Sequence, residues 1–261
     1  MEAVKIGGAK LFRADCLDIL PALPGRSIDM VFCDLPYGIT SCGWDAELNL
    51  DRLWREYMRV IKPNAAIVLT ASQPFTSKLV MSNLKYFRCE WIYAKHCASN
   101  FAQAKYAPMK EHESVLVFAD GRPAYYPIKE ARQGGGAQRA KYAYTERPRN
   151  REYIGKMNGA VDFADYAGNE ELRYPSSVQK FNNRASGDRS LHPTQKPIAL
   201  CEYFIRTYTA PGAVVLDNCM GSGTTGAASM RLGRKFIGIE KNPKYFETAK
   251  TRIYKELFNH E

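Results

Sequence analysis

The 261-residue sequence lacks the cysteine patterns that build a disulfide framework or a cysteine-rich zinc site. Its seven cysteines are odd in number, and no two of them form a Cys-x-x-Cys pair. No stretch approaches the roughly 18 consecutive apolar residues of a transmembrane helix, and the first residues contain no apolar run of signal-peptide length. These absences predict a cytoplasmic protein that binds no metal and no membrane.

Acidic side chains are also in deficit, because 27 Asp and Glu residues face 37 Lys and Arg residues, a formal charge of +10. Such a balance favours a polyanionic partner, of which nucleic acid is the commonest. The densest patch runs from Lys129 to Lys156 and has a net charge of +5. We expect its basic residues to contact phosphates, although a solvated loop surface is an alternative. They are Lys129, Arg132, Arg139, Lys141, Arg147, Arg149, Arg151 and Lys156.

Short apolar runs alternate with helix-length segments along most of the chain. Runs rich in β-branched or aromatic residues predict strands at 10–13, 28–33, 65–70, 90–94, 114–118, 213–216 and 236–239. Apolar spacing predicts helices at 50–61 and 197–208. Strands alternating with helices predict an α/β fold, Rossmann-like and doubly wound, around a mostly parallel sheet.

Residues 119–190 break this alternation, because they are rich in Gly, Arg and Tyr and have few periodic apolar positions. So long a segment without clear elements is uncommon as a plain linker inside a compact domain. We interpret it as an insertion that carries specificity, placed between residues 1–118 and 191–261 of one domain.

A glycine loop lies between the strand that ends at Asp217 and a helix that begins near Thr224. The loop contains Gly221 and Gly223, and about twenty residues later a second strand ends at Glu240. This arrangement is typical of a nucleoside cofactor site. Glycines let the backbone approach the ligand, a helix N-terminus attracts an anionic group, and the acid binds ribose hydroxyls. The loop lacks the Gly-Lys-Ser/Thr of a phosphate loop, so ATP is a less natural ligand.

A second motif, Asp34-Leu35-Pro36-Tyr37, stands at the end of a predicted strand, where open α/β sheets bind their ligands. An exocyclic amine needs two acceptors for its hydrogens and a ring face for its heterocycle. The Asp34 carboxylate, the Leu35 carbonyl and the Tyr37 ring would supply them. On these four residues alone, a turn with a capping aspartate and a packed tyrosine explains the motif equally well.

These motifs, with the loop HPTQKP at 192–197, occur in the order of the β-class amino DNA methyltransferases. The blocks DLPY, HPTQKP, LDNCMGSGTTG and FIGIEKNPKYF resemble that S-adenosylmethionine-dependent family, most closely its site-specific adenine methyltransferases. The resemblance implies a circularly permuted, seven-stranded methyltransferase sheet, with the strand at 10–13 beside the strand that ends at Glu240. It also implies a catalytic part at 1–118, a target-recognition insertion at 119–190 and a cofactor-binding part at 191–261.

The resemblance further assigns the cofactor contacts. Asp217 and the glycine loop match the residues that hold the methionine part of S-adenosylmethionine, and Glu240 matches the acid that binds its ribose. Asp15 matches the carboxylate that faces adenine, with a capping aspartate as the alternative. The complete set is Asp15, Cys16, Thr194, Gln195, Lys196, Asp217, Gly221, Ser222, Gly223, Thr224 and Glu240.

The catalytic set implied by the resemblance is Asp34, Leu35, Pro36 and Tyr37, which match the family's Asp-Pro-Pro-Tyr. Leu35 departs from that pattern, a change we expect to be tolerated because the position contributes its backbone carbonyl. The implied reaction methylates the N6 amine of an adenine flipped out of duplex DNA. Asp at the first position is more usual for adenine enzymes, and cytosine N4 is the alternative target. A carbon-5 cytosine enzyme would use an activated cysteine, usually after proline, and the chain has no Pro-Cys dipeptide.

Two other readings stay open beside this one. An RNA or protein-glutamine amino methyltransferase would usually have the cofactor motif first in the chain, whereas here the catalytic motif comes first. A non-catalytic DNA-binding relic would not be expected to keep Asp34, Tyr37 and Glu240 intact. The expected partner is double-stranded DNA, with a homodimer as a candidate assembly.

Overall fold

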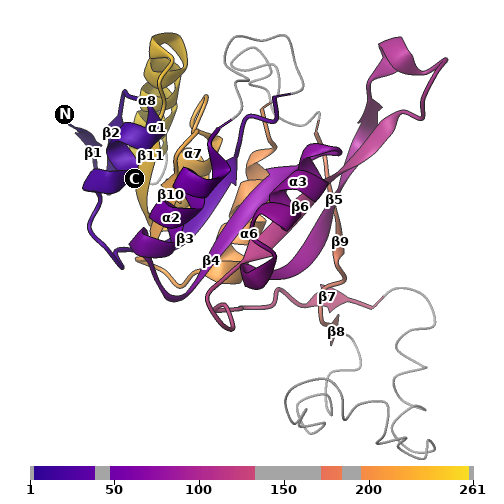
Figure 1. Ribbon diagram of the computed structural model, residues 1–261, viewed down its shortest axis with the longest axis horizontal. Coiled ribbons are helices and arrows are strands. Elements are labelled where there is room, and N and C mark those ends of the chain that lie inside the picture. Colours follow the sequence, from indigo (N-terminus) through magenta and orange to yellow (C-terminus); the bar gives the residue numbers. More distant parts are fainter. Residues whose placement is uncertain (1–2, 39–47, 133–171, 184–194, 259–261) are drawn as a thin grey trace, which may run out of the picture. The chain divides into compact units, whose positions relative to one another are not determined.

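The computed structural model describes residues 3–38, 48–132, 172–183 and 195–258 (Figure 1). Contacts divide the chain into two compact units, one of Met1–Tyr126 with Ser177–Glu261 and one of Pro127–Ser176. The first unit holds the sheet and the predicted motifs.

The described residues of the first unit form a nine-stranded sheet in the order β1-β2-β11-β10-β3-β4-β6-β5-β9. Its strands are β1 (Val4–Ile6), β2 (Ala9–Phe12), β3 (Ile28–Asp34), β4 (Ile61–Ala71), β5 (Phe87–Ser99), β6 (Lys110–Phe118), β9 (Val178–Phe181), β10 (Val214–Asp217) and β11 (Lys235–Ile239). Five of the neighbouring pairs are parallel. The pairs β1/β2, β4/β6 and β5/β6 are antiparallel.

The seven predicted strands are all present, and the predicted neighbours β2 and β11 pair in parallel, with Phe12 opposite Ile239. The prediction of a seven-stranded sheet is wrong in number. β1 folds back on β2 at one edge, and β9 adds to β5 at the other. Both additional strands are short edge strands, which leave a weak periodic signal. The circular permutation stays a prediction.

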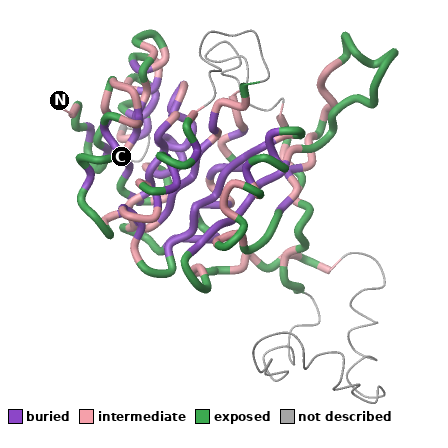
Figure 2. Tube along the Cα trace, in the orientation of Figure 1, coloured by how far each residue is buried: buried purple, intermediate pink, exposed green. Residues whose placement is uncertain are grey.

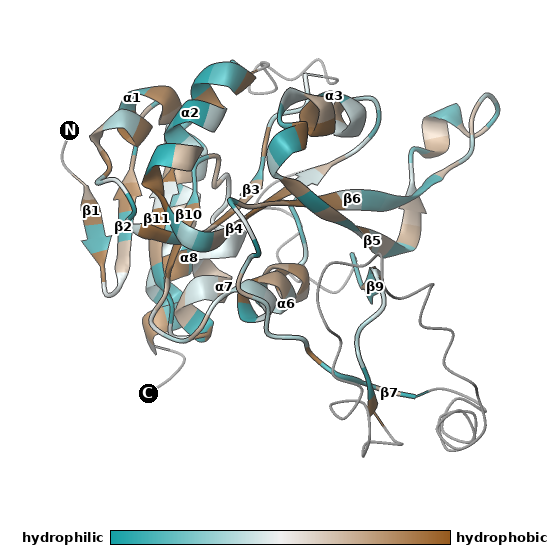
Figure 3. Ribbon diagram, turned by 60° about the horizontal axis from the view of Figure 1, so that its bottom comes forward, coloured by the Kyte–Doolittle hydropathy of each residue, from teal (hydrophilic) through white to brown (hydrophobic). Residues whose placement is uncertain are grey.

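Helices cover both faces of this sheet (Figures 1 and 3). They are α1 (Cys16–Ile19), α2 (Leu50–Val60), α3 (Phe75–Ser82), α6 (Ile198–Tyr208), α7 (Thr224–Arg231) and α8 (Pro243–Phe258), with 3-10 turns η1 (Leu20–Ala22), η2 (Leu84–Tyr86) and η3 (Phe101–Gln103). Residues of α1, α2 and α3 share one core cluster, and residues of α6, α7 and α8 share the other. None of the helices that the structure describes is long and apolar enough to cross a membrane.

The central strand β3 shows why the sheet is covered twice. Val31 and Cys33 belong to one core cluster, whereas Met30 and Phe32 belong to the other, and all four are buried (Figure 2). A strand of a parallel sheet between two helical layers is buried on both faces. Its sequence is therefore a continuous apolar run rather than an alternation of apolar and polar residues.

The second unit contains a short antiparallel pair, β7 (Glu130–Ala131) with β8 (Leu172–Arg173). Lys129 Nζ lies 5.2 Å from the Tyr174 ring centroid, and Arg173 pairs with Glu130 at 3.3 Å. Of the predicted phosphate contacts, Lys129 and Arg132 are described. The others, Arg139, Lys141, Arg147, Arg149, Arg151 and Lys156, lie outside the described residues.

Candidate active site

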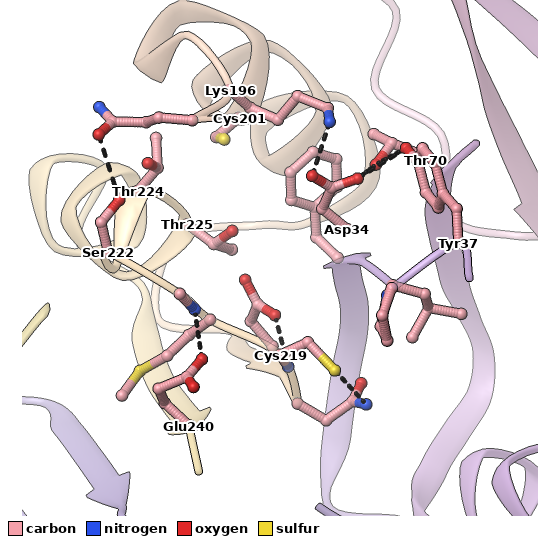
Figure 4. Close-up of a pocket in the computed structure, with 18 of the residues that line it drawn as sticks. Asp34, Tyr37, Thr70, Lys196, Cys201, Cys219, Ser222, Thr224, Thr225 and Glu240 are labelled. Carbon is pink, nitrogen blue, oxygen red and sulfur yellow. Dashed lines mark hydrogen bonds and ion pairs between the residues drawn. The ribbon is translucent and has the colours of Figure 1, made fainter. Parts of the chain in front are cut away.

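The parallel strands β3, β10 and β11 end at one edge of the sheet, and a cavity of about 490 Å³ opens there (Figure 4). The catalytic and cofactor motifs both line it. The predicted residues among its walls are Asp15, Cys16, Asp34, Leu35, Pro36, Tyr37, Gln195, Lys196, Asp217, Gly221, Ser222, Thr224 and Glu240. Thr194 lies outside the described residues. Gly223 does not line the cavity and begins α7 behind it.

Three donors converge on the Asp34 carboxylate at the end of β3. The Tyr37 hydroxyl donates to Oδ1 at 2.8 Å, and the Thr70 hydroxyl donates to the same oxygen. Lys196 Nζ donates to Oδ2 at 2.6 Å. Asp34 is held by groups from β4 and from the loop before α6, so its orientation is fixed before any ligand arrives.

Lys196 belongs to a buried chain of alternating charges. Its ammonium lies 3.1 Å from Glu113 Oε2, and Glu113 Oε1 lies 2.6 Å from Lys95 Nζ. Burial alone would lower the pKa of Lys196, but the carboxylates of Asp34 and Glu113 raise it well above its usual value. Burial alone would raise the pKa of Glu113, but the ammonium groups of Lys196 and Lys95 lower it. Lys196 and Glu113 are therefore both charged at neutral pH.

The ring of Tyr37 is supported from one side. It stacks on Phe75 of α3, with ring centroids 5.2 Å apart and planes inclined by 22°. Burial and the Asp34 charge raise the pKa of the Tyr37 phenol well above its usual value, so the hydroxyl remains a hydrogen-bond donor. Phe75 therefore supports one face of the ring, and Lys196 Nζ lies 5.9 Å from the ring centroid.

The glycine loop is tightly packed as it enters α7. Gly223 has φ +79°, a conformation that L side chains rarely adopt, and a Cβ there would lie 2.8 Å from the Ala249 Cβ in α8. Gly226, one turn into the helix, would place a Cβ 2.4 Å from Ile253 Cδ1. Together with Gly221 these residues follow the Gly-x-Gly-x-x-Gly spacing, whose third glycine allows close helix packing.

Two carboxylates flank this loop. Glu240 accepts from the Gly221 amide at 2.9 Å through Oε2 and from the Asn242 amide at 2.7 Å through Oε1. Asp217 accepts from the Cys219 amide at 3.1 Å. Burial raises the pKa of Glu240, and burial raises the pKa of Asp217 to about 6, although several hydrogen bonds oppose it. A carboxylate destabilised by burial is prepared to bind hydrogen-bond donors of a ligand.

Gln195 joins the loop before α6 to the glycine loop. Its side-chain amide lies 3.2 Å from Ser222 Oγ and 3.0 and 3.1 Å from the two terminal nitrogens of Arg252. With its oxygen toward the guanidinium, the amide accepts from Arg252 and donates to Ser222. Arg252 also donates to Thr224 Oγ1 at 2.9 Å. The buried Arg252 of α8 thus organises one end of the cavity.

Asp15 lies at the start of α1, beside the cavity. Its Oδ1 accepts from the Leu17 amide at 2.9 Å, which caps α1, and the residue also lines the cavity. Beside it, the thiols of Cys16, Cys33 and Cys219 interact with one another. The hydrogen bond with Cys219 and burial raise the pKa of Cys16, and burial raises the pKa of Cys33. The contact with Cys16 lowers the pKa of Cys219, but the contact with Cys33 and burial outweigh it, so none of the three thiols is a ready nucleophile.

Several residues of this site were not predicted from the sequence. Thr70, Phe75, Glu113 and Arg252 each contact a predicted residue. Asn218 accepts from the Tyr57 hydroxyl at 2.5 Å and ties the loop to α2. Thr70 and Glu113 stand at ends of predicted strands, and polar residues at such ends are the one signal that could have indicated them.

Asp217 should make stability depend on pH in a defined direction. Its pKa is raised from 3.8 to about 6 in the folded protein, so between these values the folded state binds more protons than the unfolded chain. The contribution of Asp217 to the free energy of unfolding therefore falls as the pH rises through this window, by up to about 1.4 kcal/mol per pH unit.

Asp217→Asn removes this titration. Urea unfolding of both proteins at several pH values should show the variant gaining stability relative to the native protein as the pH rises toward and past about 6. A stability difference that is constant over that range would contradict the raised pKa of Asp217.

The sequence and the fold were compared with known proteins. A family model described as DNA methylase, of the N6/N4 type, matches residues 28–251. The chain is 30% identical over 262 residues to the DNA adenine methyltransferase YhdJ of Escherichia coli strain K12, covering 93% of this chain and 82% of that protein.

Solved structures of the same fold show lower identity. The complex of M1.HpyAVI with SAM has a TM-score of 0.60 at 21% identity, covering 94% of this chain and 98% of that one. The cytosine-N4-specific PvuII DNA methyltransferase has a TM-score of 0.66 at 16% identity, covering 98% and 95% of the two chains.

Proposed function

The chain belongs to the N6/N4 DNA methylase family, and we propose that this amino DNA methyltransferase methylates the N6 amine of adenine in duplex DNA. We propose S-adenosylmethionine as the methyl donor. The observation that carries the proposal is one cavity lined both by the Asp34-Leu35-Pro36-Tyr37 motif and by the glycine loop with Glu240. An amine acceptor and a nucleoside cofactor would meet there.

Two observations favour adenine over cytosine as the target. An aspartate, Asp34, occupies the first position of the catalytic motif, where adenine enzymes of the resembling family more usually have it. The relative at 30% identity is named a DNA adenine methyltransferase. The likeness to a cytosine-N4 enzyme concerns the fold alone.

The residues around the glycine loop fit S-adenosylmethionine. The Glu240 carboxylate accepts backbone hydrogen bonds from Gly221 and Asn242, and its two oxygens offer further lone pairs for ribose hydroxyls. Asp217 and the Gly221–Gly223 segment would hold the methionine part, and Asp15 beside Cys16 would face the adenine. Gln195 and Lys196, together with Thr194, would close the amino-acid end. When bound, S-adenosylmethionine supplies an electrophilic methyl group on a sulfonium sulfur.

The catalytic motif would orient the target amine. The Asp34 carboxylate and the Leu35 carbonyl would accept its two hydrogens, which directs the nitrogen lone pair toward the methyl donor. The Leu35 side chain is buried in the core, so a leucine is accommodated where relatives have proline. The Tyr37 ring would stack on the flipped base and offset about 1–3 kcal/mol of the cost of extruding it. Positioning and accommodation of the charge that develops on nitrogen supply most of the catalysis.

Lys196 has a role that follows from its two partners. In the structure Lys196 Nζ donates a hydrogen bond to Asp34 Oδ2, the oxygen that an incoming amine would approach. Its ammonium also pairs with Glu113 at 3.1 Å, so it keeps a counter-ion when Asp34 engages the base. Lys196 would then hold Asp34 oriented until the amine arrives.

The insertion at 119–190 would recognise the target sequence. In its described part, Lys129 and Arg132 carry the positive charge expected of phosphate contacts, and the wider Lys129–Lys156 patch would make DNA binding fall steeply with salt.

The product identifies the target base. The protein is expressed in a host without adenine methyltransferases, and the DNA is digested to nucleosides and separated by mass. N6-methyladenine is expected, and the Asp34→Ala variant, expressed to the same level, is the control for background methylation. N4-methylcytosine in place of N6-methyladenine would reject the adenine assignment while leaving the family assignment intact.

A further inference from the structure

The hairpin of β5 and β6 carries an unusual tip, residues 100–109, which connects the two strands. Three of its large apolar side chains are exposed: Phe101 by 64%, Tyr106 by 89% and Met109 by 43%. Scattered exposed apolar residues are normal on a protein surface, but a group of three on one projecting loop marks an interaction site.

The backbone of the tip is ordered although its side chains face solvent. Asn100 adopts φ 74°, and η3 (Phe101–Gln103) follows it directly. The Tyr106 and Ala107 amides donate to the Gln103 carbonyl at 2.9 and 3.0 Å. Local hydrogen bonds therefore order the backbone of the tip, and its two aromatic side chains are exposed.

The tip lies at the catalytic edge of the sheet. β6 is antiparallel to both β4 and β5, so the carboxyl end of β5 lies at the same edge as Thr70 at the end of β4. β4 pairs with β6 only as far as Ala71 opposite Ser114, whereas β6 begins at Lys110. The hairpin consequently extends past its neighbour, as Figures 1 and 3 show.

The base of this extension is the wall of the catalytic cavity. Lys95 and Ser99 of β5 and Lys110 and Glu113 of β6 all line it. Lys110 Nζ lies 3.5 Å from Ser72 Oγ in the segment that follows β4. A ligand that places one base in the cavity would bring its adjoining parts against the tip.

The charge of the hairpin tip indicates what kind of partner it binds. The strands β5 and β6 carry both signs, and Lys95 is paired with Glu113, but the tip at 100–109 contains Lys105 and no acidic residue, and Lys110 follows it directly. Cations interleaved with exposed aromatic rings suit a polyanion with stacked planar groups, which describes nucleic acid. Apolar side chains inserted between base steps are a known means of unstacking a duplex.

We propose that the hairpin tip inserts Phe101 and Tyr106 into duplex DNA beside the target base, filling the stack from which that base is extruded. This inference rests on the proposed function. Its physical basis is that extrusion breaks base stacking, and a ring placed in the gap restores part of the lost contact. Lys105 and Lys110 would contact the phosphates on either side.

The test compares native and heat-denatured genomic DNA as acceptors of labelled methyl groups. The double variant Phe101→Ser, Tyr106→Ser should lose about tenfold or more of its initial rate on native DNA. On denatured DNA, where the target base is already unstacked, the rate of the double variant should stay within about threefold of the rate of the unsubstituted protein. The control is Tyr254→Ser on α8, a tyrosine that is 54% exposed outside the cavity, which should change neither rate.

Equal losses on both forms of DNA, or no loss on the duplex, would overturn the insertion. Replacing the two residues by tryptophan should retain the duplex rate, which separates ring insertion from folding defects. If the native protein methylates neither form of DNA, the proposed function fails instead, so the two failures are distinguishable.

Discussion

Asp34→Ala is expected to lower the rate of methyl transfer by at least about 10³-fold while leaving cofactor affinity within about threefold of the native value. The carboxylate is the only charged member of the catalytic motif, and its loss removes both the orientation of the amine and the stabilisation of the charge that develops on it. The glycine loop and Glu240, which we propose to bind the cofactor, do not contact Asp34 through any hydrogen bond described for it.

The variant should still fold, because Lys196 keeps Glu113 as its counter-ion at 3.1 Å. Methyl incorporation into duplex DNA measures the rate, calorimetric titration measures the affinity for S-adenosylmethionine, and thermal unfolding checks the fold. Asp51→Ala, at an exposed position in the first turn of α2, controls for the loss of one negative charge and should leave the rate unchanged. Full activity of Asp34→Ala, or loss of cofactor binding, would mean that its role is misassigned.

Gly223→Ala is expected to destabilise the protein by about 2–5 kcal/mol and to weaken cofactor binding. About 1–2 kcal/mol comes from a left-handed backbone with a side chain. A further 1–3 kcal/mol, roughly, comes from overpacking against Ala249, because the new Cβ would lie 2.9 Å from its Cα, a backbone atom that cannot turn aside. Relief of this contact moves α7 away from α8 and carries Ser222 and the glycine loop with it.

Gly212 provides a matched control, because it has the same φ of +79° and a Cβ there would meet nothing within 4 Å. The free energy of unfolding of Gly212→Ala should therefore fall only by the cost of the left-handed backbone, about 1–2 kcal/mol. Urea unfolding at neutral pH measures both, and the difference between the two variants isolates the contact with α8. If Gly223→Ala were no more destabilising than Gly212→Ala, the close packing at the start of α7 would not matter for stability.

Much of the fold followed from local patterns. The apolar runs at 28–33 and 65–70 became β3 and β4, and the glycine loop fell between β10 and α7 as expected. These features can be predicted from neighbouring residues. A strand buried on both faces needs a continuous apolar run, and a turn into a helix needs a glycine, and both are visible within a short stretch of sequence. The edge strands β1 and β9 were missed. Both are too short for a clear periodic signal, and β9 in addition forms on β5, a strand distant in the sequence, whereas β1 pairs with the adjacent β2.

The sequence by itself determined the α/β class, the order of the catalytic and cofactor motifs and the family. Only the tertiary structure decided that Lys196 binds Asp34 across 162 residues, that Phe75 supports Tyr37, and that the β5–β6 hairpin projects from the cavity wall. The physical reason is that these contacts join residues from separate segments of the chain, and the residues around each partner do not indicate which segments will meet. The order and direction of the strands bring their ends to one edge of the sheet, and that order is set by packing of the whole domain.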